Sequence, residues 1–378
     1  MLIQVHMLQN YAPANLNRDD TGSPKDAIFG GVRRGRISSQ CLKRSIRRSA
    51  TFAGAFRKAG LLGDRTKKLP KLISDELVAM GVDKEAHPAI VARVPEIGRE
   101  STKGRQQPGT KGDTDSTDVT EAETKQLIFI GKNELRPLAE RLLAIYREHG
   151  SKKWAKLKIA DITKALGKSV PRSVDIAMFG RMTTSDAFED VQAAVQVAHA
   201  LSTNALAQEF DYYTAVDDLS GESGAGMIGD IEFNSSTFYK YLNIHWEQLV
   251  ENLGGDRAIA RQAVLALVEA AATAQPSGKQ NSFAAHNLPD VVLVEVRQKN
   301  LPVSYANAFI KPVRQDFNRS LMDASVESLA DYMARVTKTY RLDGKRAMIS
   351  VQDHTLPGAE VNDSMPDLQS WMESQLLE

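Results

Sequence analysis

The chain has 378 residues, of which 42% are hydrophobic and 25% charged, which is typical of a globular protein with two or three structural units. It has no apolar run long enough for a membrane-spanning helix, no secretory signal at residues 1–6, and one cysteine, Cys41, so an internal disulfide is excluded. We therefore expect a protein of the reducing cytoplasm with no membrane partner.

The net charge of +1 conceals opposite charges at the two ends of the chain. Residues 1–48 carry nine lysines and arginines against three acids, whereas residues 353–378 carry six acids and no lysine or arginine. A basic front favours binding to a polyanion, and the acidic tail could contact a basic surface on a neighbouring copy. A solvated surface with chance clustering of charge is the alternative.

The first predicted element is a strand at residues 2–8, in which Ile3, Val5 and Met7 share one face. Residues 10–26 are rich in Asn, Pro, Asp and Gly and indicate a loop. Residues 28–32 then indicate a short strand and turn.

A basic helix follows. Ser38 or Ser39 can cap it, Leu42 and Ile46 form its apolar stripe, and lysine and arginine side chains occupy another face. Helical stretches are predicted near 69–92 and 121–149, separated by a polar loop at 99–120. Beyond them we predict strand-like sequence at 169–182, an amphipathic helix at 187–201, a hairpin of strands at 210–215 and 230–241, a helix at 259–275, a strand at 291–296, a helix at 321–340 and a polar, acidic tail.

This order of elements predicts an α+β fold. The simplest assembly is a β-α-β…β-α-β core with insertions, which is ferredoxin-like, or RNA-recognition-motif-like, architecture.

Sequence signals for catalysis are weak. The seven histidines are isolated, and zinc, phosphate-loop and serine-nucleophile motifs are absent, so we expect no catalytic residue, no metal and no cofactor. Two acidic pairs, Asp19–Asp20 and Asp217–Asp218, could hold Mg²⁺ for phosphodiester cleavage or could cap turns. We favour the structural role for both pairs.

Features of nucleic-acid binding are stronger. Guanidinium and ammonium groups near the helix start suit phosphate oxygens, and the candidates are Arg18, Lys25, Arg33, Arg34, Arg36, Lys43, Arg44 and Arg47. Unpaired bases could lie on Met182, Tyr212 and Tyr213. The alternatives are core filling for Met182 and cross-strand packing for the two tyrosines.

Several separated motifs resemble one family. They are Leu16-Asn17-Arg18-Asp19-Asp20, Asp26-Ala27-Ile28-Phe29-Gly30-Gly31, Arg36-Ile37-Ser38-Ser39-Gln40 with Leu42-Lys43-Arg44, Val174-Asp175-Ile176-Ala177 with Gly180-Arg181-Met182, Thr214-Ala215-Val216-Asp217-Asp218, Glu251-Asn252-Leu253-Gly254-Gly255, Gly278-Lys279-Gln280 and Ala306-Asn307-Ala308-Phe309. In these motifs and in their order along the sequence, the chain resembles the CasC-type backbone subunit of Cascade, the type I-E CRISPR surveillance complex.

The resemblance implies a hand-shaped subunit: an RNA-recognition-motif-like palm (1–48, 170–205 and 233–378), a helical fingers insertion (49–169) and a thumb hairpin (206–232). It implies a non-catalytic protein whose copies stack head to tail along the CRISPR guide RNA, kink it at intervals and present it for pairing with target DNA. The implied partners are the guide RNA, neighbouring copies, other Cascade subunits and, through the guide, target DNA.

The resemblance also implies which residues contact RNA. Guide-backbone contacts would fall on Arg18, Lys25, Ser38, Gln40, Lys43, Arg44 and Arg47. Arg181 and Met182 would lie at the kink, Tyr212, Tyr213 and Thr214 on the thumb, and Lys279 and Gln280 near the guide. The family often has tryptophan and phenylalanine where this chain has Tyr212 and Tyr213.

Two other functions remain open from the sequence. Related CRISPR backbone proteins cleave RNA through a loop aspartate, so Asp19, Asp20 or Asp26 could serve a metal-dependent endoribonuclease. A self-assembling structural protein with incidental charge is the third possibility.

Overall fold

The structure is a computed structural model that describes residues 1–97, 122–166, 173–183, 187–216, 219 and 225–377. The chain divides into two compact units. Unit 1 comprises residues 1–53, 195–246 and 261–378, and unit 2 comprises residues 54–194 and 247–260. Across the described ranges, no helix combines the length and hydropathy required to cross a membrane.

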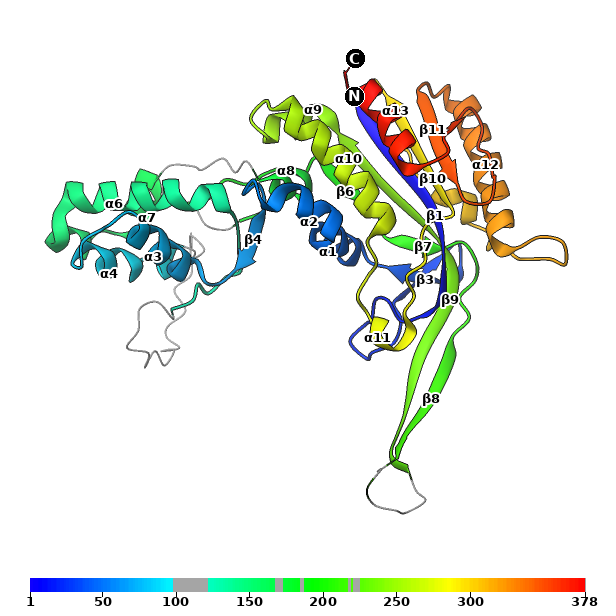
Figure 1. Ribbon diagram of the computed structural model, residues 1–378, viewed down its shortest axis with the longest axis horizontal. Coiled ribbons are helices and arrows are strands. Elements are labelled where there is room, and N and C mark those ends of the chain that lie inside the picture. Colours follow the sequence, from blue (N-terminus) through cyan, green and yellow to red (C-terminus); the bar gives the residue numbers. More distant parts are fainter. Residues whose placement is uncertain (98–121, 167–172, 184–186, 217–218, 220–224, 378) are drawn as a thin grey trace. The chain divides into compact units, whose positions relative to one another are not determined.

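A mixed sheet forms the centre of unit 1 (Figure 1). Its middle strand, β1 (Leu2–Ala14), pairs antiparallel with β10 (Val291–Arg297) on one side and with β9 (Ala225–His245) on the other. The short strands β6 (Val195–Val197) and β7 (Ala200–Ser202) pair antiparallel with β9. The strand order is β12-β11-β10-β1-β9-β7-β3-β2, where β11 is Lys345–Ser350, β12 is Glu360–Val361, β3 is Val32–Ile37 and β2 is Asp26–Phe29.

Helices cover both faces of this sheet. On one face Leu42 and Ile46 of α1 (Ser39–Arg48) and Ala271 of α10 (Arg257–Thr273) lie with Val5 and Met7 around a small apolar cavity. On the other face α12 (Leu321–Tyr340) and the 3₁₀ turn η2 (Ala306–Phe309) complete an apolar cluster that contains Leu8, Leu293, Leu329 and Met333. A central strand with helices on both sides must be buried on both faces, and residues 2–9 of β1 are.

The predicted polar face of β1 is therefore interior. Glu295 of the neighbouring strand β10 pairs with Gln4 and lies at the centre of a buried polar cluster. Its carboxylate accepts hydrogen bonds from Gln4 at 3.1 Å, Arg297 at 2.7 Å and Tyr305 at 2.8 Å. Burial raises the pKa of Glu295, but the neighbouring His6 ring and the guanidinium groups of Arg346 and Arg297 outweigh burial and hold it at about 2. Burial lowers the pKa of His6, whose ring stacks on Tyr305. The cluster satisfies polar groups that the sheet would otherwise leave unpaired.

The predicted elements near the N-terminus are confirmed. The strand at 2–8 is present and continues to Ala14, so the loop is shorter than residues 10–26 suggested. The strand and turn at 28–32 form the β2–β3 hairpin. The Ser38 hydroxyl caps α1 by accepting from the Cys41 amide, and Leu42 and Ile46 are the buried residues of that helix.

Further along, the hairpin, the helices at 259–275 and 321–340 and the strand at 291–296 are also present. The hairpin is built from β8 (Glu209–Val216) and β9, and it extends beyond the sheet (Figure 1). The α12 bounds agree with the prediction because Ser320 and Asp323 form a capping box at its start.

Three predictions are wrong. Residues 187–201 are not helical, because β6 and β7 complete the edge of β9 and the hydrogen bonds of that edge override helical periodicity. Residues 174–179 form a helix, α8 (Val174–Phe179), rather than a strand. The tail is not simply polar, since α13 (Met365–Leu377) buries Leu368, Met372 and Leu376 within unit 1.

Unit 2 is mainly helical, as the stretches near 69–92 and 121–149 predicted. Trp154 lies in its core, where its indole N–H donates to the Ala89 carbonyl at 2.9 Å. The polar loop predicted at 99–120 lies outside the described residues. The elements are β4 (Gly63–Thr66), α3 (Leu69–Ala79), α4 (Ala86–Val91), α5 (Val94–Ile97), β5 (Ile128–Gly131), α6 (Lys132–Trp154), α7 (Ile159–Leu166) and α8, while α2 (Ala50–Arg57) and α9 (Trp246–Asn252) lead into it from unit 1.

Lys240 on β9 gives a stability prediction. It is 6% exposed among the apolar side chains of α1, α10 and β1, and Nζ donates to the Ala271 carbonyl at 3.4 Å. Burial lowers its pKa to about 7, so between about pH 7 and 10.5 the unfolded chain holds a proton that the folded chain does not. Unfolding free energy therefore rises with pH through this window, by at most about 1.4 kcal/mol per unit, and the full penalty applies below pH 7.

We expect Lys240→Met to be more stable than the wild type at pH 7 and to lose the rise between pH 7 and 10.5. Denaturant unfolding at several pH values measures both effects. Lys338→Met, at an exposed position of α12, is the matched control and should leave the pH dependence unchanged. A Lys240→Met variant that is destabilised equally at all pH values would contradict the burial penalty.

Candidate nucleic-acid interface

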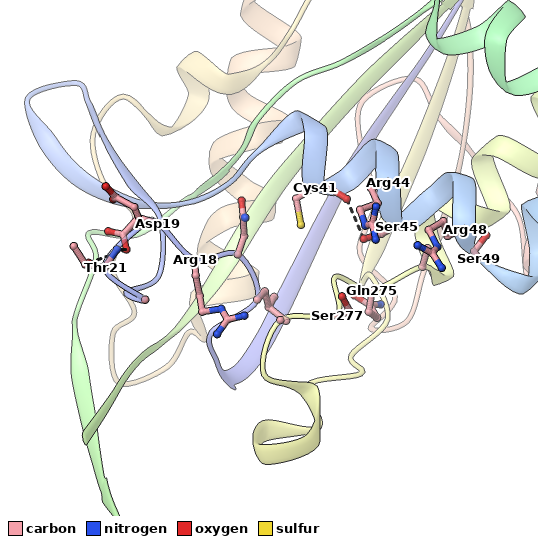
Figure 2. Close-up of a pocket in the computed structure, with 16 residues that line it drawn as sticks. Arg18, Asp19, Thr21, Cys41, Arg44, Ser45, Arg48, Ser49, Gln275 and Ser277 are labelled. Carbon is pink, nitrogen blue, oxygen red and sulfur yellow. Dashed lines mark hydrogen bonds between the residues drawn. The ribbon is translucent and has the colours of Figure 1, made fainter. Parts of the chain in front are cut away.

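An open cleft of about 940 Å³ lies on unit 1 (Figure 2). Three segments line it: the loop after β1, the outer face of α1, and the chain that follows α10. The lining residues are Leu16, Asn17, Arg18, Asp19, Asp20, Thr21 and Gly22 of the first, Cys41, Arg44, Ser45, Arg48 and Ser49 of the second, and Ala274, Gln275, Ser277 and Gly278 of the third.

Close backbone contact holds the first and third segments together. A Cβ atom on Gly278 would lie 2.3 Å from the Leu16 carbonyl oxygen, so only glycine allows this approach. Asn15 Nδ2 donates to the carbonyls of Gly22 at 3.0 Å and Glu232 at 2.9 Å. Residues more than 200 positions apart thereby fix the loop that carries Arg18.

Asp19 organises the tip of that loop. Its Oδ1 accepts from the Thr21 amide at 2.9 Å, the Thr21 hydroxyl at 2.8 Å and the Ser23 amide at 3.0 Å. The Thr21 hydroxyl is the main cause of the lowered pKa of Asp19, so the carboxylate is ionised and engaged with its own turn. This arrangement agrees with the structural role that we favoured for Asp19; Asp217–Asp218 lies outside the described residues.

The cleft presents exposed guanidinium groups. Arg44 and Arg48 are four residues apart on α1, about one helical turn, and both are exposed, whereas Leu42 and Ile46 are the buried residues of the helix. Arg18 is exposed on the loop. In the described part of the chain, no carboxylate lies within ion-pair distance of these three arginines. Positive charge without an internal partner can accept an external anion.

The walls between these arginines are polar and already hydrogen-bonded. The Ser45 and Ser49 hydroxyls donate to the carbonyls of Cys41 at 3.0 Å and Ile46 at 2.8 Å. Gln275 accepts from the Tyr11 hydroxyl at 2.6 Å and donates to the Asn287 carbonyl at 2.8 Å. Fixed walls of this kind favour an extended polar ligand over a buried apolar one.

A second group of cations surrounds the start of α1. The Ser39 amide donates to His199 Nδ1 at 3.1 Å, and burial, then Arg36, then Lys25 lower the pKa of His199. A neutral imidazole thus caps the helix beside two cations, and exposed Gln40 follows in the first turn. Because the amides at a helix start also attract negative charge, this end of α1 extends the basic surface.

The remaining basic residues of the prediction differ in role. Lys43 and Arg47 are half-buried along the side of α1, where they make contacts of their own. Lys279 precedes α11 (Gln280–Phe283) with a positive φ of 48°. The Gln280 side-chain amide donates to the carbonyls of Pro276 at 3.0 Å and Ala285 at 3.2 Å, so it stabilises the loop next to the cleft.

Arg34 is a correction to the phosphate-directed set. Its side chain is fully buried, and it donates to the carbonyls of Thr203 at 2.8 Å and Phe309 at 2.7 Å, among others. Backbone carbonyls take the place that phosphate oxygens would have, so this guanidinium serves the fold. Arg33 pairs with Asp26 and donates to Gln208, so it is partly neutralised.

The β8–β9 hairpin places its two tyrosines on opposite faces. Tyr213 is 38% exposed and lies over Gly229 of β9, where an added Cβ would be 2.5 Å from its ring, so this ring packs across the strands. Tyr212 is 65% exposed, on the same face as Phe210 and Thr214. Tyr212 is therefore the better placed of the two to contact another molecule.

Met182 and Arg181 lie in unit 2. Met182 is 93% exposed, so the core-filling alternative is wrong. Arg181 is 5% exposed and pairs with Glu134 at 2.9 Å, so its guanidinium is engaged inside the unit and does not support the predicted direct contact with RNA.

Sequence reasoning omitted Arg48, Gln275 and Ser277. The spacing of Arg48 from Arg44 places both on one face of the helix and could have identified it. Gln275 and Ser277 come from a segment about 230 residues away, and no local signal links them to α1. Described His, Cys, Asp and Glu side chains form no group of three or more that could hold a metal ion.

The chain belongs to the CT1975-like protein family, because the family model Cas_CT1975 matches residues 3–373. One similar solved chain, from a structure described as "CRISPR RNA-guided surveillance complex, pre-nicking", has a TM-score of 0.79 and 29% identity, with 100% of both chains covered. A second, described as "CRISPR RNA-guided surveillance complex", has a TM-score of 0.62 and 24% identity, with 99% of each chain covered. No curated protein matches the chain. The matches confirm the predicted CRISPR-associated family and the α+β fold class.

Proposed function

We propose that this chain is a non-catalytic, RNA-binding backbone subunit of a CRISPR RNA-guided surveillance complex of the Cascade type I-E class. The observation that carries the proposal is the open cleft of unit 1, where Arg18, Arg44 and Arg48 are exposed between fixed polar walls. The family match and the likeness to a chain of such a complex support the same assignment. In this function the ligand is the CRISPR guide RNA.

The chemistry of the cleft favours the RNA backbone over the bases. A guide carries a different sequence in each complex, so its holder must contact the phosphates and sugars that all guides share. Guanidinium groups on two segments can bind successive phosphates, and the start of α1 can bind another. Bases that the protein does not contact stay available for pairing with target DNA.

We further propose that the sheet of unit 1 is an RNA-recognition-motif-like palm. Its central strands run β10-β1-β9-β6, all neighbours antiparallel, with α1 between β1 and β6 and α10 between β9 and β10 in sequence. That is the order of a ferredoxin-like β-α-β-β-α-β core. The helical unit would then be the fingers and the β8–β9 hairpin the thumb.

Head-to-tail stacking of copies is part of the proposal. The hairpin exposes apolar side chains on both of its faces, including Phe210, Tyr212, Met227 and Ile228. Exposed apolar surface on a two-stranded hairpin is unfavourable in water unless another molecule covers it. A neighbouring copy and the guide RNA, together with other Cascade subunits, are the proposed cover.

The first prediction from the proposed function concerns the cleft arginines. We expect the triple variant Arg18→Gln, Arg44→Gln and Arg48→Gln to bind single-stranded RNA more weakly and with less salt dependence. Each lost phosphate contact should lower the slope of log K against log salt by about 0.7, or roughly 2 in all. Fluorescence anisotropy across a salt series measures the slope.

The matched control removes the same charge elsewhere on unit 1. Lys299→Gln, Arg335→Gln and Lys338→Gln change three exposed cations outside the cleft. This control should keep the wild-type slope. Equal losses in both triple variants would mean that general charge, not the cleft, binds RNA.

The second prediction concerns assembly. The full chain purified with its native RNA should give a large species containing RNA of uniform guide length, and RNase should collapse it, because the guide holds successive copies together. Sizing by light scattering before and after digestion measures this. An assembly that contains no RNA, or that resists RNase, would favour the self-assembling structural protein instead.

The third prediction separates binding from cleavage. Since Asp19 holds the loop of Arg18, we expect Asp19→Ala to bind RNA more weakly than Asp19→Asn, which keeps a side-chain oxygen acceptor, and we expect RNA to stay intact with Mg²⁺. Gel analysis of labelled RNA and binding assays measure these outcomes. Mg²⁺-dependent cleavage that is lost in Asp19→Ala or Asp20→Ala would establish the metal-dependent endoribonuclease in place of this proposal.

A further inference from the structure

The loop that carries Arg18 is rigid within itself. Arg18 forms a β-bridge with Pro24, and the Lys25 amide donates to the Asn17 carbonyl at 2.8 Å, which closes the loop at its base. Hydrogen bonds to Asp19 hold its tip. Because a loop fixed in this way moves as a whole, the position of Arg18 depends on what holds the residues that precede the loop.

Those preceding residues are held from two directions. The Asn15 side-chain amide donates to the Glu232 carbonyl, at the base of the β8–β9 hairpin, at 2.9 Å. The Leu16 carbonyl lies against the backbone of Gly278, so close that a Cβ atom would not fit between them. One contact thus comes from β9 and the other from the loop around α11, residues 276–286. The position of Arg18 depends on both.

The α11 loop is strained. Lys279 and Ala284, on either side of α11, both have a φ of 48°, in the left-handed region that residues with side chains disfavour. The Gln280 side chain crosses the loop and donates to the carbonyls of Pro276 and Ala285. Such strain persists only where surrounding contacts hold it, so the loop needs support from another segment.

Phe283 supplies that support by joining the α11 loop to the hairpin. The centroid of its ring lies 5.6 Å from that of Phe233, with an angle of 44° between the rings, and both residues are half-buried. Phe233 is the residue after Glu232 on β9. The ring contact therefore meets β9 next to the carbonyl that accepts the Asn15 hydrogen bond.

Three segments thus touch one another in pairs. The segment that leads into the Arg18 loop meets β9 at Asn15 and the α11 loop at Gly278, and the α11 loop meets β9 at Phe283. Each contact constrains the other two. Removing the ring contact would free the α11 loop, and with it the Gly278 contact that places Arg18.

We propose that Phe283 and Phe233 are positioning residues that act through Arg18, so that the base of the hairpin is part of the RNA-binding frame. The inference rests on the proposed function and specifies how the cleft holds one of its arginines. Neither phenylalanine is among the residues that line the cleft, and Arg44 lies on α1, outside this set of contacts. A residue that supports a binding group without touching the ligand acts by fixing its geometry.

The test is a double-mutant cycle on RNA binding by the full chain, measured by fluorescence anisotropy of a labelled single-stranded RNA across a salt series. Phe283→Ala should lower the slope of log K against log salt by up to about 0.7, the value for the one phosphate contact of Arg18. In the Phe283→Ala background, Arg18→Gln should cause little further loss. Arg44→Gln should lower the slope by about another 0.7 in that background.

Two variants serve as controls. Phe283→Tyr keeps the ring and should have the wild-type slope. Phe317→Ala removes a fully exposed ring elsewhere in unit 1 and should change nothing. Phe233→Ala removes the same contact from the side of β9 and should repeat the result of Phe283→Ala, so the test stands if one of the two variants folds poorly. Thermal midpoints identify such a variant.

The outcomes separate this inference from the proposed function. If neither Arg18→Gln nor Arg44→Gln changes the slope of the otherwise unaltered chain, RNA does not bind at the cleft and the proposed function loses its site. If both change it but the losses from Phe283→Ala and Arg18→Gln add, the positioning inference alone is overturned. If Phe283→Ala also removes the effect of Arg44→Gln, the ring supports the whole cleft rather than Arg18, which overturns the inference as well.

Discussion

Strand β1 is the constraint on which unit 1 depends. It hydrogen-bonds to β10 along one edge and to β9 along the other, and both of its faces are buried from Leu2 to Gln9. Because β1 is paired along both edges and buried on both faces, it has one register. A shift by one residue would exchange Val5 and Met7 with Gln4 and His6 between the two faces. The loop that follows β1 therefore starts from a fixed point, and the contact of Gly278 with Leu16 fixes its course. The cleft is a consequence of this frame.

Arginines that the sequence alone does not distinguish have different roles in the structure. Arg34 satisfies backbone carbonyls in the interior, Arg181 forms a buried ion pair, and Arg44 is exposed in the cleft. Burial decides the difference, since a guanidinium out of water must be fully hydrogen-bonded whereas an exposed one can exchange water for phosphate. Density of positive charge alone could identify a basic segment but could not rank its members.

Elements with their own local signals could be predicted from sequence: the capped helix α1, the helix α12 with its capping box, the apolar strand β10 and the hairpin around a glycine-rich tip. Residues 187–201 could not, because their strands exist only by pairing with β9. The loop and α1 sides of the cleft could be predicted, since Arg18 and Arg44 lie in one basic segment. Its third side could not, because Ser277 comes to line the same cleft as α1 only through the folding of the whole sheet, which no local pattern encodes.

The exposed arginines of the cleft and the backbone frame that positions them make physically different contributions to binding the proposed ligand. Exposed arginines act through charge, so their contribution weakens as salt rises. The frame beneath them acts through short-range contacts, since the side-chain amide of Asn15 and the contact of Gly278 with Leu16 set the course of the loop that carries Arg18. Salt screens such contacts less than it screens exposed charges. Raising salt should therefore release the RNA while the folded cleft keeps its shape.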